Sequence, residues 1–269
     1  MTAVTPEDEA AIEATKAPLM EHLVELRKRL IWSIVSFVAA FLICFYFAKD
    51  IYGFLATPLV SALTGQPNDH LIYTGITEGF FTYVKVAMFA GLCVAFPLIA
   101  AQLWMFVAPG LYRHERRAFL PFLMATPVLF LTGAAFVYYI MLPFAIRFFV
   151  SYQNTGANGM PAIQLQARMT EYLDFVMTLI IAFGLCFQLP VLLSLLGRVG
   201  IISAAQLRSM RRYAIVAVFA VAAVMTPPDI FSMLSLAIPL VGLYEISIVC
   251  VVLIERQRAR DDAARAAAK

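Results

Sequence analysis

Charged residues are scarce in this chain of 269 residues. They make up 14% of it, against about 25% in an ordinary soluble domain, while hydrophobic residues make up 62%. This composition excludes an ordinary soluble domain and predicts an integral membrane protein. The net charge is only +3, and we expect no nucleic-acid partner.

Paired cysteines and clustered histidines are also missing. Each of the four cysteines lies alone inside an apolar run, with no CxxC spacing, and is expected to be a small buried hydrophobe. The three histidines lie outside the apolar runs and far apart in the sequence. A metal site, a cofactor site or an intramembrane hydrolase therefore has little to build on, and we expect no enzymatic activity.

No cleavable signal peptide is expected at the start of the chain. Its first apolar run follows a polar stretch of about 29 residues, so the first helix is expected to stay in the membrane. Residues 1–18 are acidic with almost no large apolar side chains and predict a disordered tail. Residues 19–30, LMEHLVELRKRL, have apolar residues at helical spacing and predict an amphipathic helix on the membrane surface.

Six apolar segments follow, which predicts an all-α membrane protein with six transmembrane helices. The fifth has only about 14 residues, roughly 21 Å of helix, and the sixth is interrupted by Pro239, so both are expected to be shorter than the bilayer. No internal repeat is evident. We divide the chain into a tail (1–18), a membrane domain (19–254) and a charged tail (255–269). The expected spans are 30–48, 80–107, 119–150, 172–196, 213–226 and 230–254.

The basic residues predict the orientation. Six spans place both termini on one side, and short cytoplasmic loops collect Lys and Arg. Sixteen of the 20 basic residues lie on the side of the termini, which we therefore take as cytoplasmic. The four on the other side are Lys49, Lys85, Arg147 and Arg168.

Two carboxylates on this basic face are candidates for ligand binding. Glu25 is four residues before Arg29, so a simple intrahelical pair is one interpretation. Glu115 lies among three arginines in a turn after Pro109, and a solvated or interhelical acid is again the plain interpretation. The alternative is that the two approach each other and receive guanidinium groups from a ligand, because arginine binds carboxylates bidentately.

Several motifs together resemble the TatC family, the core membrane subunit of twin-arginine protein translocase. They are HLVELRKRL (22–30), QLWMFVAPGLYRHERR (102–117), FGLCFQLP (183–190), and MTPPDIFS with AIPLVGLYEI (225–246). The resemblance implies a receptor in the bacterial inner membrane that binds twin-arginine signal peptides through Glu25 and Glu115. It also implies a multimeric complex with TatA- and TatB-type single-span subunits, exporting folded proteins by the proton-motive force.

Two polar residues inside the apolar spans remain. Gln188 replaces a glutamate that many TatC proteins carry in a FxxxFExP-like run; it could contact a partner helix, or close a backbone gap left by Pro190. Glu245 lies in the sixth span, where an ionisable residue marks function unless it reaches water or a basic loop residue. A secondary transporter or channel using these two residues is the alternative function.

Overall fold

The computed structural model describes residues 6–63, 71–107, 116–153, 165–225 and 230–267. These residues are almost entirely helical, with no strand among them and one isolated bridge between Ile72 and Arg168. The helices are α1 (Pro6–Tyr46), α2 (Ala48–Leu63), α3 (Glu78–Val107), α4 (Arg116–Phe136), α5 (Leu142–Val150), α6 (Met169–Cys186), α7 (Leu189–Val199), α8 (Ala204–Ser209), α9 (Arg211–Met225) and α10 (Ile230–Ala267), with a π-helical turn, η3 (Val137–Met141), between α4 and α5.

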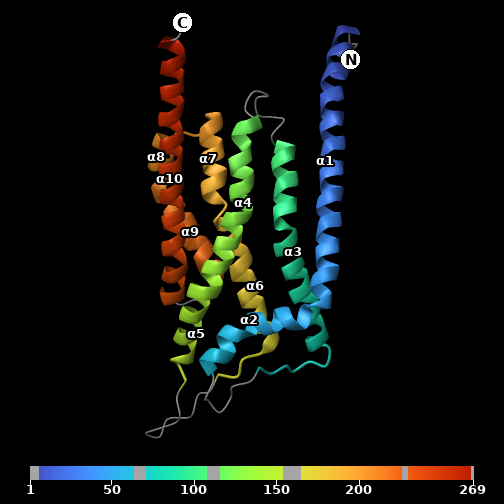
Figure 1. Cartoon of the computed structure of the whole chain (residues 1–269), viewed down its shortest axis with the longest axis vertical. Coiled ribbons are helices and arrows are strands. Elements are labelled where there is room, and N and C mark those ends of the chain that lie inside the picture. Colours follow the sequence, from blue (N-terminus) through green and yellow to red (C-terminus); the bar gives the residue numbers. More distant parts are fainter. Residues whose placement is uncertain (1–5, 64–70, 108–115, 154–164, 226–229, 268–269) are drawn as a thin grey trace, which may run out of the picture.

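Five helical segments of the described chain are long and apolar enough to cross a membrane. They match five of the six predicted spans. The remaining span is α9, which has 15 residues, about 22 Å of helix, as expected for the short fifth span. The first residues of α1 and the last of α10 lie at the same end of the molecule (Figure 1), which agrees with an even number of crossings.

The N-terminal region is part of the first long helix. α1 begins at Pro6, and residues 19–30 continue directly into the first span as part of the same helix (Figure 1). The disordered tail expected for residues 1–18 stays a prediction. Pro6 suits the first position of a helix, and the following residues include Ala, Glu and Lys, which favour helix, with no glycine to interrupt them.

The connection after the first span contains a further helix. α2 occupies Ala48–Leu63 and lies crosswise at one end of the bundle (Figure 1). Pro58 is inside this helix, and Leu55 and Leu59 are buried. The apolar face of α2 packs against the spans, and this burial stabilises the helix.

Prolines modify two of the long spans. The third span is continuous from α4 to α5 but passes through the π-helical turn η3 just before Pro143, a typical way for a helix to accommodate a lost backbone donor. The fourth span is broken at Phe187 and Gln188, and α7 restarts with Pro190 in its first turn.

The sixth span is not a short helix. α10 has 38 residues and runs through Pro239 and on beyond residue 254. A single internal proline removes one hydrogen bond, and the helix is intact on both sides of it. The Ala- and Arg-rich segment after 254 favours helix and extends α10. The division of the chain into a membrane unit and two tails stays a prediction.

Buried side chains gather where α2, α3, α5 and α6 meet. Val86, Leu142, Leu173 and Val176 are completely buried there. α1 packs chiefly along α3 at one edge of the molecule, and α10 stands at the other edge beside α7 and α9 (Figure 1). The candidate residues Glu25 on α1, Gln188 between α6 and α7, and Glu245 on α10 therefore lie in different parts of the bundle.

Candidate functional site

Glu25 lies on α1 with its carboxylate half-buried and paired. Oε1 of Glu25 accepts a hydrogen bond of 3.0 Å from Nη2 of Arg29, one helical turn further on. The exposed fractions of the two side chains are 31% and 27%. The intrahelical pair predicted from the spacing is thus present, and it leaves both groups accessible to solvent.

Arg29 also connects this pair to α3. Its Nη1 donates to Oε1 of Gln102 at 3.2 Å and lies 3.3 Å from Sδ of Met105. One turn before Glu25, the imidazole of His22 stacks on the ring of Phe106, with centroids 4.4 Å apart. The middle of α1, which carries Glu25, is therefore fixed against the last two turns of α3.

Glu115 lies outside the described residues. By chain position it immediately precedes α4, and α3 ends eight residues earlier at Val107. The structure thus brings Glu25 to the end of α3 from which the segment containing Glu115 departs. The predicted approach of the two carboxylates stays a prediction.

Gln188 points into the bundle at the break between α6 and α7. Its Nε2 donates to the carbonyl oxygens of Thr126 on α4, at 3.0 Å, and of Gly184, at 3.3 Å. The backbone N–H of Gln188 bonds to Leu185 instead of Gly184, so the side chain takes the carbonyl that the break frees. This agrees with the interpretation of Gln188 as a residue that closes a backbone gap, although the gap is at Gly184.

The Oε1 atom of Gln188 is buried, with no hydrogen-bond partner among the described residues. The amide orientation is nevertheless determined, because two carbonyl oxygens require a donor. Thr126 extends the contact to a third helix, since its hydroxyl accepts from Nε1 of Trp104 at 3.0 Å. Gln188 therefore connects α6 and α7 to α4, and through Thr126 to α3.

Glu245 of α10 is paired with a basic residue. Its Oε2 lies 2.7 Å from Nη2 of Arg211, the first residue of α9, and the exposed fractions are 44% and 47%. Of the predicted alternatives, the contact with a basic residue near the loop is confirmed. Gln188 and Glu245 bind separate neighbours, so nothing in the described contacts forms a shared polar path for a transported solute.

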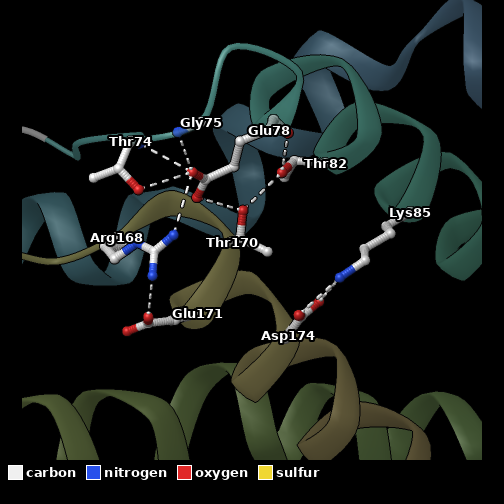
Figure 2. A network of polar contacts seen from close by, with 9 residues as sticks. All are labelled: Thr74, Gly75, Glu78, Thr82, Lys85, Arg168, Thr170, Glu171 and Asp174. Carbon is white, nitrogen blue, oxygen red and sulfur yellow. Dashed lines mark hydrogen bonds and ion pairs between the residues drawn. The ribbon is translucent and has the colours of Figure 1, made fainter.

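A polar network that the sequence did not predict lies at the opposite end of the bundle from the termini. Figure 2 shows it around Glu78, the first residue of α3. Oε2 of Glu78 accepts from the backbone N–H groups of Thr74, at 2.9 Å, and Gly75, at 3.0 Å. Oε1 accepts from the hydroxyl of Thr170 on α6 at 2.7 Å. One carboxylate thereby closes a turn and joins two helices.

Arg168 completes this network. Its Nη2 lies 3.4 Å from Oε2 of Glu78 and its Nη1 2.8 Å from Oε1 of Glu171. The hydrogen bond with Glu78 and the charge of that carboxylate raise the pKa of Arg168, so the guanidinium stays protonated. Further along the same helices, Lys85 pairs with Asp174 at 2.9 Å (Figure 2). The start of α3 is thus bound to the start of α6.

Comparison with known proteins decides the family. The profile described as Sec-independent protein translocase protein (TatC) matches residues 21–239. The chain belongs to the TatC family. A Sec-independent protein translocase protein TatC of Magnetococcus marinus is 47% identical over 252 residues, 94% of this chain and 90% of the relative. The TatC protein of Escherichia coli K12 is 40% identical, covering 88% of this chain and 89% of the relative.

A solved structure of a TatC protein has the same fold. The crystal structure titled twin arginine translocase receptor TatC superimposes with a TM-score of 0.75 at 39% identity, covering 87% of this chain and 99% of the other. TatC membership agrees with the helical membrane architecture and identifies the chain as a component of a protein translocase. Within the described residues, no group of three or more His, Cys, Asp and Glu side chains could hold a metal ion.

Proposed function

We propose that this TatC protein is the receptor for twin-arginine signal peptides in Sec-independent protein export. In this proposal Glu25 and Glu115 accept the guanidinium groups of the peptide on the cytoplasmic face. The substrates are proteins that are already folded, and the proton-motive force drives their passage. The protein resides in the bacterial inner membrane as a multi-pass subunit.

The observation that carries the proposal is the state of Glu25. Its carboxylate is half-buried against α3 and already binds a guanidinium, that of Arg29, at 3.0 Å. A site that accepts an internal guanidinium supplies the geometry and partial desolvation that a peptide arginine needs. Family membership supports the same assignment, because the structural neighbour is titled a twin arginine translocase receptor.

The same proposal includes partners within the membrane. α1 exposes large apolar side chains along its length, including Ile31, Trp32 and Val35, which suit lipid or another apolar helix. We propose that single-span TatA- and TatB-type subunits assemble with this chain in a multimeric complex. Gln188 and Glu245 are the intramembrane polar residues proposed to contact them, and the half-exposed carboxylate of Glu245 is the more accessible of the two.

Peptide binding to the purified full-length protein tests the receptor proposal. A twin-arginine signal peptide and its Lys-Lys version are titrated against wild type, Glu25→Gln and Glu115→Gln. Loss of a charge-assisted, bidentate contact is expected to weaken Arg-Arg binding by about 10-fold or more and to abolish the preference for Arg-Arg over Lys-Lys.

Glu21→Gln is the matched control, because it removes one negative charge from the same helix, one turn earlier in the sequence. It should leave the preference intact. Thermal unfolding of each variant checks that the fold persists. Equal affinity of both peptides for wild type and both Glu variants would mean that neither carboxylate recognises the guanidinium pair.

A further inference from the structure

Arg29 holds the place on Glu25 that the proposed function gives to a peptide arginine. Its Nη2 donates to Oε1 of Glu25 at 3.0 Å, while its Nη1 is bound to Gln102 and Met105 on α3. The neighbouring cations Arg27 and Lys28 are exposed. Among the described cations of this turn, Arg29 is the one that binds the carboxylate.

The contacts of Arg29 with α3 do not depend on Glu25. Gln102 and Met105 accept from Nη1, whereas Glu25 accepts from Nη2, so the guanidinium can release the carboxylate and remain attached to α3. A guanidinium with no second contact would lose all of its protein hydrogen bonds when it left the carboxylate. Because Arg29 keeps its contacts with α3, the free-energy cost of releasing Glu25 is small.

The paired arrangement also carries a penalty. The Nε–H of Arg29 is buried and has no hydrogen-bond partner among the described residues. A buried donor without an acceptor destabilises the state that contains it. The Glu25–Arg29 pair is thus not the arrangement that satisfies all the donors of Arg29, and a small movement of the guanidinium can relieve this.

We propose that Arg29 is an internal competitor, which occupies Glu25 until a guanidinium of the signal peptide displaces it. This inference rests on the proposed role of Glu25 as a peptide acceptor. Because binding requires the fraction of molecules in which Glu25 is released, the apparent affinity of every peptide is reduced by that same fraction. Arg29 then lowers the apparent affinity of every peptide by the same factor, and the ratio of the affinities of two peptides stays unchanged.

This equal effect distinguishes competition from direct support. If Arg29 instead held Glu25 in the orientation that reads the peptide, its removal would weaken binding and would change the preference for Arg-Arg over Lys-Lys. Competition predicts the opposite sign, tighter binding, and an unchanged preference. The two roles of Arg29 therefore differ in both measurements.

The test titrates Arg-Arg and Lys-Lys peptides against the full-length protein with Arg29→Gln, Lys28→Gln and Glu25→Gln. Arg29→Gln is expected to tighten binding of both peptides by the same factor, about two- to five-fold, since ion pairs between residues four apart on a helix are of modest strength. Lys28→Gln is the matched control: it removes one positive charge at an exposed neighbouring position, and so measures the general loss of repulsion.

Salt separates the local effect from general repulsion. Affinities are compared at about 0.1 M and about 1 M ionic strength, because long-range repulsion between exposed charges is screened at the higher value whereas a partly buried contact is screened less. The excess tightening of Arg29→Gln over Lys28→Gln should persist at high salt. Its disappearance, weaker binding by Arg29→Gln, or a changed peptide preference would each overturn the proposal.

Two further variants keep the result interpretable. Arg29→Lys retains the charge but not the planar guanidinium, and it should tighten binding in the same direction by a smaller factor; it carries the test if Arg29→Gln does not fold. Glu25→Gln tests the proposed function separately. If it leaves affinity and preference unchanged, Glu25 is not the acceptor, whatever Arg29 does.

Discussion

Gly91 of α3 lies directly against the backbone of Phe41 on α1. A Cβ atom added to Gly91 would be 2.8 Å from Cα and 2.9 Å from N of Phe41, closer than real Cβ contacts allow. Glycine at this position lets the two helices approach, as small residues do at helix contacts in membranes. The same packing of α1 on α3 places Arg29 within hydrogen-bond distance of Gln102.

Replacing Gly91 by alanine is therefore expected to destabilise the protein. Alanine normally favours a helix over glycine by about 1 kcal/mol, but here its methyl group meets backbone, and overpacking of this kind costs about 1–3 kcal/mol. Gly242→Ala is the matched control, because Gly242 lies in α10 with nothing within 4 Å of an added Cβ. Thermal unfolding in detergent should show a lower midpoint for Gly91→Ala alone; equal midpoints would contradict the contact.

Glu78 should matter more for the fold than its neighbour Glu171. Both carboxylates pair with Arg168, but only Glu78 also accepts from the Thr74 and Gly75 backbone and from Thr170. Glu78→Gln turns one acceptor oxygen into a donor facing other donors, so it is expected to lower the unfolding midpoint and to expose residues 71–77 to protease.

Glu171→Gln removes the same charge from a side chain that is 68% exposed and serves as the control. It is expected to change neither the midpoint nor the cleavage pattern. Equal sensitivity of the two variants would mean that the charge of Arg168 alone matters, and that the turn closed by Glu78 contributes nothing.

The contrast between Glu25 and Glu78 shows how far sequence reasoning reached. The pair of Glu25 with Arg29 follows from helical spacing and was predicted, but Gln102 is 73 residues away from Arg29 and becomes its partner only when α1 packs on α3. Glu78 carried a local signal, an acidic residue at a helix start after Thr74 and Gly75. Its partners Arg168 and Thr170 are about 90 residues away, and no local pattern connects them.

The helix ends show a similar division. The apolar runs and prolines predicted the second, third and fifth spans closely, because the requirement to cover a bilayer dominates there. Residues 6–18 and the segment after 254 are polar, so no apolar run marks them, yet α1 begins at Pro6 and α10 continues to Ala267. In these segments helix propensity decided the backbone.

Gln188→Glu should be tolerated, but only with the new carboxyl group protonated. Nε2 of Gln188 faces the carbonyl oxygens of Thr126 and Gly184, and an ionised carboxylate there would meet two acceptors without a donor. Infrared difference spectroscopy against wild type should show the carbonyl band of a neutral carboxylic acid near neutral pH. A carboxylate band in a stably folded variant would contradict this orientation.

Gln188→Leu provides the comparison for that variant. It removes both hydrogen bonds, and because such bonds in membrane proteins contribute about 0.6–2 kcal/mol each, a measurable loss of stability is expected. Gln188→Glu should lie between wild type and Gln188→Leu, since a neutral acid donates one hydrogen bond where the amide donates two.

The short helix α9 should thin the bilayer beside it. Its 15 residues span about 22 Å against a hydrocarbon thickness of about 30 Å, and its apolar side chains Val216, Val221 and Val224 are exposed. Lipid that covers these side chains must adapt to the shorter helix, because tilting would increase the mismatch. Cryo-electron microscopy in lipid nanodiscs should therefore show headgroup layers closer together beside α9 than beside α1.

The extent of this thinning can be changed by one insertion. Four apolar residues added to α9 lengthen it by about 6 Å and should restore most of the bilayer thickness beside it, while the same insertion in the part of α10 beyond residue 254 should leave the lipid unchanged. If thinning lowers the barrier to protein passage, export in vesicles should slow with the first insertion only. Full bilayer thickness beside the unmodified α9 would exclude this role, because partner subunits would then have to cover the mismatch.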